Sequence, residues 1–206
     1  MTRAVAGQAQ PPLFLLMWVL ANLLGGFVVG FLESNGMQFA ATLVLTGAVL
    51  GTLQWSVLRH TVQQVRWWPW ASALGWIVGS LVLSLSIDLY TPLVNALWQQ
   101  FGLWEVFWLN LVTGPVPVLT MALAQALVLN RRIRPSQWLL VNLAAGVVKG
   151  GVGAAMCAAV CPSLPIALVG IVNGVAWTTY GVITGIALLY LLKPPQGSGE
   201  EVCDRT

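Results

Sequence analysis

A four-residue spacing that ends in two glycines occurs three times along this chain. The three copies are Trp18, Asn22, Gly26 and Gly30; Trp67, Ala71, Gly75 and Gly79; and Trp138, Asn142, Gly146 and Gly150. Residues four apart share one face of an α-helix, so each copy predicts a helix with a glycine stripe that another backbone can approach closely. We interpret these glycines as helix-packing positions; the alternative is that they let a ligand reach the backbone.

A second pattern lies between these copies and indicates a duplication. Its members are Gly47, Gly51, Gln54, Leu58 and Arg59; Val118, Ala122, Gln125, Leu129 and Asn130; and Gly181, Gly185, Leu188, Leu192 and Lys193. Gln54 and Gln125 are as far apart in sequence as Trp67 and Trp138, so both patterns repeat with one period. We therefore predict three tandem repeats at about 12–60, 61–131 and 132–193, the third of which has lost its glutamine.

The composition points to a lipid surrounding. Hydrophobic residues make up 58% of the 206 residues and charged residues only 7%, with a mean hydropathy of +0.82. A soluble domain has about 25% charged residues. Six stretches have the roughly 20 apolar residues that a spanning helix needs: 12–32, 39–58, 68–87, 107–129, 137–160 and 167–192. The bilayer is therefore the expected partner, and no dense basic stretch indicates nucleic-acid binding.

The charges predict the orientation in the membrane. One side of the six-helix arrangement receives Arg3, Arg59, Arg66, Arg131, Arg132, Arg134, Lys193 and Arg205. The loops of the other side carry Glu33, Asp88 and Glu105 and no Lys or Arg. Because basic residues favour the cytoplasmic side, we expect both termini in the cytoplasm, in a bacterial inner or thylakoid membrane.

These patterns together predict an all-α, polytopic membrane bundle. Residues 1–195 would form one transmembrane domain of six helices, arranged as three tandem hairpins with pseudo-three-fold symmetry, and 196–206 a disordered cytoplasmic tail. Asn35 and Gly36 predict a tight turn in the first outer connection. The spacing over 93–104 predicts a short amphipathic helix on the outer interface. Pro115 and Pro117 predict a kink in the fourth helix.

Lys149 is the first candidate for a functional role. It lies about 18 Å along the fifth helix, near the expected middle of the bilayer, where an ionisable side chain indicates function because its desolvation is costly. Asp88 is the expected counter-ion. The alternatives are a lysine that extends to the interface and a neutral amine bonded to a carbonyl.

Buried amides form the second group of candidates. Gln54 and Gln125 occupy equivalent places, as do Asn22 and Asn142, and Asn173 adds another amide. Such side chains usually bond between membrane helices. The alternative is a ring of amides around the pseudo-axis that binds a neutral ligand or passes a small solute. Trp76 and Trp177 are also expected deep in the bundle, either packed or lining a lipophilic pocket.

Known catalytic patterns are absent from the sequence. Cys157 and Cys161 share a helix face, and the sequence leaves open whether they pair; with no nearby His or acid they are a weak metal signal. His60 is the only histidine. There is no P-loop, dinucleotide fingerprint or pair of catalytic carboxylates. We therefore predict no enzyme activity and no metal site, and the cofactor, if any, stays unknown.

One stretch resembles a known group of proteins. Gln54-Trp55-x-x-Leu58-Arg59, followed by Trp67-Trp68-x-x-Ala71-x-x-x-Gly75-Trp76-x-x-Gly79, resembles uncharacterised polytopic membrane proteins frequent in cyanobacteria. The resemblance covers about residues 47–80 and implies a polytopic membrane fold without an established activity. Mitochondrial carriers are also built from three helical hairpins, but the proline–acid–base signature of these carriers is absent here.

Two functional hypotheses follow. The first is a non-enzymatic accessory or scaffold subunit of a membrane assembly that also binds a lipophilic ligand, with a membrane protein or a second copy as partner. The second is a small transporter or channel for a neutral or anionic solute. Its path would run past Lys149, Gln54, Gln125, Asn22 and Asn142.

Overall fold

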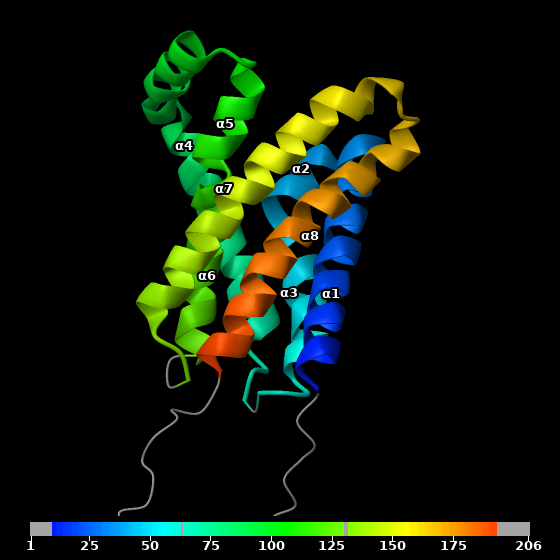
Figure 1. Ribbon diagram of the computed structural model, residues 1–206, viewed down its shortest axis with the longest axis vertical. Coiled ribbons are helices and arrows are strands. Elements are labelled where there is room, and N and C mark those ends of the chain that lie inside the picture. The colour runs from blue at the N-terminus through cyan, green and yellow to red at the C-terminus, as the bar shows by residue number, and fades with distance from the viewer. Residues whose placement is uncertain (1–9, 63, 130–131, 193–206) are drawn as a thin grey trace, which may run out of the picture.

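The computed structural model describes residues 10–62, 64–129 and 132–192, and its elements are helices (Figure 1). In chain order they are α1 (Pro11–Leu32), the π-helical segment η1 (Glu33–Met37), α2 (Gln38–Ala40), the π-helical segment η2 (Ala41–Leu45), α3 (Thr46–Leu58), α4 (Trp68–Phe101), α5 (Glu105–Thr113), α6 (Pro115–Leu129), α7 (Pro135–Val160), the 3-10 segment η3 (Cys161–Ser163) and α8 (Ile166–Leu191). No strand occurs in these ranges, so the all-α prediction is confirmed. The predicted tail at 196–206 lies outside the described residues.

Five helical stretches, rather than six, are long and apolar enough to cross a membrane. They are Pro11–Leu58, Trp68–Phe101, Glu105–Leu129, Pro135–Ser163 and Ile166–Leu191. The first stretch contains two of the expected spans, because the chain leaves helical geometry at Asn35 and Gly36. Gly36 has a φ of 89°, which glycine adopts without a Cβ penalty. On either side of this turn, α1 and α3 pack against each other (Figure 1).

The two ends of the bundle differ in charge. The start of α1 and the end of α8 lie at the same end of the molecule (Figure 1). The loops at this end carry Arg59, Arg66, Arg132 and Arg134, and we call it the basic end. At the opposite end are η1, the α4–α5 connection and the α7–α8 connection; we call this the acidic end, after the glutamates of η1 and α5.

The segment after Pro92 differs from the sequence prediction. Instead of a separate interfacial helix over 93–104, α4 continues without interruption to Phe101. An interior proline removes one backbone donor, here the one that would bond to the carbonyl of Asp88. The helix nevertheless continues through the proline, so the expected boundary was wrong.

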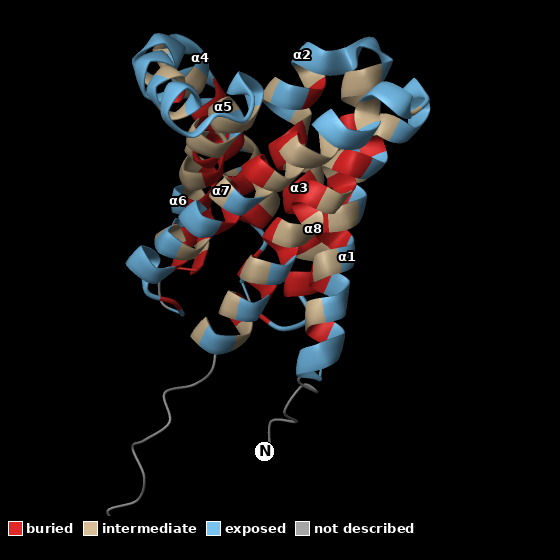
Figure 2. Cartoon of the chain, turned by 45° about the horizontal axis from the view of Figure 1, so that its top comes forward, coloured by how far each residue is buried: buried red, intermediate tan, exposed pale blue. Residues whose placement is uncertain are grey.

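Three tryptophans form the centre of the core nearest the basic end. Trp18, Trp68 and Trp138 are each 0% exposed, and both successive pairs have ring centroids 6.3 Å apart. Figure 2 shows buried residues gathered where the helices face one another. Trp67, which the sequence pattern placed in the equivalent position, is 57% exposed. Trp68 and Ser72 face the bundle interior, whereas Gly75 faces α6. The tryptophan equivalent to Trp18 and Trp138 is therefore Trp68, and the sequence assignment of Trp67 was wrong by one residue.

Candidate functional site

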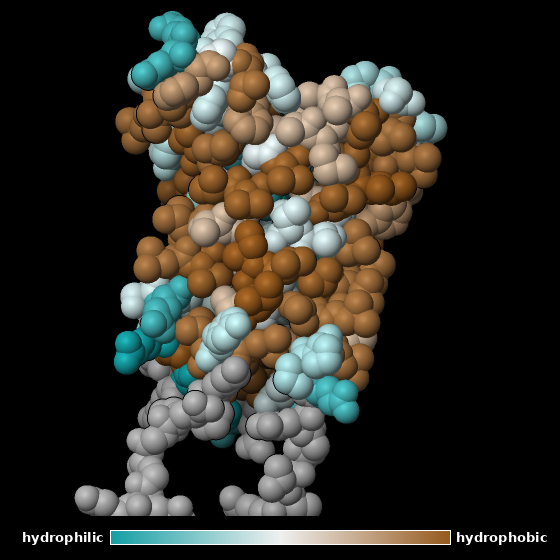
Figure 3. All heavy atoms as spheres, viewed as in Figure 1, coloured by the Kyte–Doolittle hydropathy of each residue, from teal (hydrophilic) through white to brown (hydrophobic). Residues whose placement is uncertain are grey.

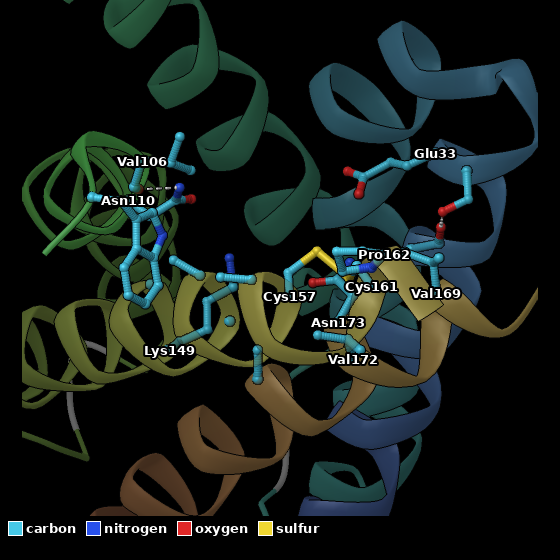
Figure 4. A pocket seen from close by; sticks show the side chains of 18 residues that line it. Glu33, Val106, Asn110, Lys149, Cys157, Cys161, Pro162, Val169, Val172 and Asn173 are labelled. Atoms are coloured by element: carbon cyan, nitrogen blue, oxygen red, sulfur yellow. Dashed lines mark hydrogen bonds between the residues drawn. A yellow bond between two sulfur atoms is a disulfide. The ribbon is translucent and has the colours of Figure 1, made fainter. Parts of the chain in front are cut away.

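A cavity of about 570 Å³ lies towards the acidic end, between η1 and helices α5, α7 and α8 (Figure 4). Its lining is mainly apolar, with valines and alanines from α5, α7 and α8. The polar side chains on its wall are Glu33, Ser34, Asn110, Lys149 and Asn173. Ligand sites in proteins typically have volumes of about 300–1,000 Å³ and a few polar groups on an apolar wall. This cavity has both properties.

Lys149 reaches the cavity from α7 and is half-buried. Its ammonium nitrogen Nζ lies 4.5 Å from the ring centroid of Trp177 and 6.0 Å from that of Trp76. The two rings are themselves 5.7 Å apart. A cation over an aromatic face is stabilised by the ring quadrupole. Among the described residues no hydrogen-bond acceptor contacts Nζ, so these rings are its only close partners there.

Glu33 supplies the opposite charge on the cavity wall. It begins η1, directly after α1, and its Oε1 accepts a hydrogen bond of 2.8 Å from Thr42 Oγ1. Glu33 and Lys149 line the same cavity, yet in the described part of the chain no direct ion pair joins them. Asp88, the counter-ion expected from the sequence, does not line the cavity. The expectation of Asp88 rested only on the depth of each residue along its helix. It did not take into account that α1 packs on α8, which places Glu33 at the cavity.

Sequence reasoning missed Glu33, although one signal pointed to it. Glu33 follows Gly30 by three residues, on the side of α1 that carries the glycine stripe. A Cβ added at Gly30 would lie 2.6 Å from Asn173 Cβ, so α1 and α8 touch at this level. That contact places the end of α1 beside the cavity wall formed by α8.

The other predicted amides lie outside the cavity, in a buried layer. Gln54 Nε2 donates to Asn22 Oδ1 at 2.9 Å, and Trp68 Nε1 donates to Gln54 Oε1 at 3.2 Å. Gln125 and Asn142 belong to the same layer, each 0% exposed. Their bonds come from Gln125 Nε2 to Ser72 Oγ at 2.8 Å and from Tyr180 OH to Asn142 Oδ1 at 2.5 Å. We call these residues the polar layer. The structure thus brings Lys149 together with Glu33 and Asn173, and not with the polar layer.

A disulfide also lines the cavity. Cys157 and Cys161, at the end of α7 and the start of η3, are bonded, with Cα atoms 4.7 Å apart. The sequence left this pairing open. The bond lies between Lys149 and Glu33 in the view of Figure 4, beside Asn173. It closes one turn of the chain at the acidic end.

The glycine stripes lie at close contacts between helices. A Cβ added at Gly26 would meet the Trp177 ring, and one at Gly30 would meet Asn173 and Gly170. At Gly75 it would meet Met121 and Thr120, and at Gly79 it would meet Pro117 and Thr120. At Gly146 it would meet Pro115, and at Gly150 the Asn110 carbonyl. Where the sequence predicts a kink, the helix is divided at Gly114 into α5 and α6, although Gly114 itself keeps helical φ and ψ. The prolines of the predicted kink are buried rather than on the cavity wall.

The site therefore consists of an ammonium, a carboxylate and two amides around a mainly apolar space. Asn173 makes no side-chain hydrogen bond within the described residues, and the Nδ2 of Asn110 bonds to the carbonyl of Val106 at 2.8 Å. These groups can bind a polar head while the apolar wall contacts a hydrocarbon portion. No protein-family model, curated protein or solved structure matches the chain.

Proposed function

We propose that this chain is a non-catalytic integral membrane protein whose cavity at the acidic end holds an amphipathic ligand. In this role it would serve as an accessory or scaffold subunit of a membrane assembly. The observation that carries the proposal is the cavity itself, in which Lys149 and Glu33 face a mainly apolar wall. A lipophilic molecule with a polar head matches both parts of this lining.

The outer surface supports placement in a bilayer. Apolar side chains cover the visible face between the two ends, and hydrophilic ones gather towards the ends (Figure 3). On α4, Leu85 is 89% exposed and Leu89 is 78% exposed. Lipid accommodates such side chains, whereas soluble monomers rarely expose large contiguous apolar patches.

The charges and the disulfide support one orientation. Basic side chains favour the cytoplasmic side of a membrane, and disulfides persist in oxidising compartments outside the cytoplasm. The basic end would therefore face the cytoplasm of a bacterium or the equivalent side of a thylakoid. The Cys157–Cys161 bond would lie at the outer side, near the cavity.

The polar layer supports three tandem hairpins as the origin of the six-helix plan. One bond joins the two helices of each proposed hairpin: Gln54 to Asn22, Gln125 to Ser72, and Tyr180 to Asn142. A tryptophan joins successive hairpins in two places, Trp68 to Gln54 and Trp18 to Thr184. At the third place, Trp138 Nε1 and Gln125 Oε1 are a buried donor and acceptor without partners among the described residues. Tyr180 and Thr184 would together replace the lost third glutamine.

The same layer favours binding over transport. A solute path through the bundle centre would need polar groups free to contact the solute. Gln54 and Gln125 are 1% and 0% exposed, and their amide nitrogens are already bonded within the protein. We therefore place the ligand in the cavity and give these amides a structural role.

Native mass spectrometry of protein extracted in mild detergent from its own membrane tests this function. We expect a retained lipophilic molecule in near-stoichiometric amount. Ala158→Trp should lower the occupancy of this molecule at least about tenfold. Ala158 is exposed and lines the cavity, so the indole of a tryptophan at this position can fill the space that the ligand needs. Ala159→Trp is the matched control, since Ala159 is also exposed but is not part of the cavity wall.

Two results would overturn the binding function: no retained molecule in the wild type, or equal retention in both tryptophan variants. The same spectra examine the accessory role. A protein partner in fixed ratio supports it, whereas a protein that carries ligand but never a partner or a second copy argues against a scaffold.

A further inference from the structure

We propose that the ligand held in this cavity is zwitterionic, with its anionic group at Lys149 and its cationic group at Glu33. The inference rests on the proposed binding function and adds the chemical class of the ligand. It comes from two ionisable side chains, one basic and one acidic, that line one cavity without forming an ion pair with each other in the described part of the chain.

Each charge is held in place by a separate partner. The Lys149 ammonium lies over the Trp177 ring, and the Glu33 carboxylate accepts from Thr42. An ammonium has three donors, and a carboxylate can accept about four hydrogen bonds. Most of this capacity is unused by the described residues, and leaving charged groups unsatisfied beside an apolar wall is costly. A ligand with complementary charges would satisfy both groups at once.

The arrangement along the cavity fits a ligand that spans the two charges. Lys149 comes from α7 and Glu33 from η1, and Asn173 lies between them in Figure 4. The free amide of Asn173 can donate to a phosphate or carboxylate oxygen. The valines on the wall, Val106, Val169 and Val172, remain for a hydrocarbon portion.

Other charge types fit less well. A purely anionic head would gain Lys149 but be repelled by Glu33, and a cation would be repelled by Lys149. Like charges in a site of low dielectric are strongly unfavourable. An uncharged head would leave both groups without a charged partner. Two sources have the required chemistry: a lipid with a phosphate–ammonium headgroup, and a free amino-phosphate or amino acid.

The test compares headgroups on the full chain. Purified protein is exchanged against vesicles with equal amounts of phosphatidylethanolamine, phosphatidylglycerol and diacylglycerol, and bound lipid is measured by native mass spectrometry. We expect at least about a tenfold preference for phosphatidylethanolamine over each of the others. Glu33→Gln should abolish the preference over phosphatidylglycerol, since both the ammonium partner and the repulsion of anions are lost. Lys149→Met should abolish binding of both phospholipids relative to diacylglycerol.

Two controls separate ligand recognition from misfolding. Lys149→Arg keeps the positive charge and should retain the phospholipid preference. Asp88→Asn removes an acid that does not line the cavity and should leave all three occupancies unchanged. Competition by free phosphoethanolamine at concentrations that displace the lipid would identify a soluble zwitterion as the ligand, and its failure to compete would identify the lipid.

The outcomes distinguish this inference from the proposed function. Lipid bound without headgroup preference, a preference for phosphatidylglycerol, or an unchanged preference in Glu33→Gln would overturn the zwitterion while leaving the binding cavity intact. Absence of any bound lipophile or zwitterion would overturn both.

Discussion

Gly75→Leu is expected to prevent the bundle from assembling. A Cβ at this position would lie 2.7 Å from the Cα of Met121 and 2.8 Å from the carbonyl oxygen of Thr120. Both are backbone atoms of α6, so a rotamer change cannot relieve the contact, and α4 must move away from α6. Membrane helices associate mainly through such close packing, because lipid provides no hydrophobic drive between them. Gly146→Leu should act similarly, since its Cβ would lie 3.0 Å from the Cα of Pro115.

Alanine variants make this test quantitative. Gly75→Ala should lower stability by about 1–3 kcal/mol, the usual cost of overpacking, or about 2–9 °C in Tm. Gly151→Ala is the matched control, because Gly151 is also buried in a helix but its Cβ would make only ordinary contacts, the nearest at 3.5 Å. There the higher helix propensity of alanine should leave stability unchanged or slightly raised. Size-exclusion profiles and thermal denaturation in detergent measure both. Equal Tm values for the two alanine variants, with normal yield of Gly75→Leu, would contradict the packing role.

The sequence predicts the helices well because a spanning helix needs an uninterrupted apolar stretch. The expected stretch 137–160 lies within α7 (Pro135–Val160), and 107–129 lies within α5 and α6 taken together. Boundaries fail where a helix continues past the end of its apolar stretch. The stretch expected at 68–87 is the example, since α4 continues through Pro92 to Phe101.

The pairing of helices is harder to predict from sequence. Trp67 and Trp68 are adjacent and chemically identical, and the packing of other helices decides which one is buried. Trp68 is the buried one: it bonds to Gln54 of α3 and lies beside the rings of Trp18 and Trp138. The site shows the same limit. Lys149 is recognisable from its depth in an apolar helix, whereas Glu33 lies far away in sequence and reaches the cavity through the contact of α1 with α8.

The polar layer gives the second large effect. Gln54→Leu is expected to destabilise the protein by about 2–5 kcal/mol, because it leaves Asn22 Oδ1 without its donor and Trp68 Nε1 without its acceptor. Hydrogen bonds between membrane helices are individually modest, averaging about 0.6 kcal/mol. The larger cost comes from the two buried groups left without partners. Thermal denaturation should show a Tm lower by about 5–15 °C.

A double-mutant cycle tests the cause of this loss. Trp68→Phe removes the donor that Gln54→Leu leaves unsatisfied, so the double variant should be more stable than the sum of the two single effects predicts, by about 0.5–3 kcal/mol. Gln137→Leu, at an exposed position of α7, is the control for the same chemical change and should stay within about 0.5 kcal/mol of the wild type. Strict additivity would show that the bond does not contribute. If Gln54→Leu keeps the wild-type Tm but loses bound ligand, the amides act as a ligand site rather than as structural links, and the ligand would have to reach the polar layer.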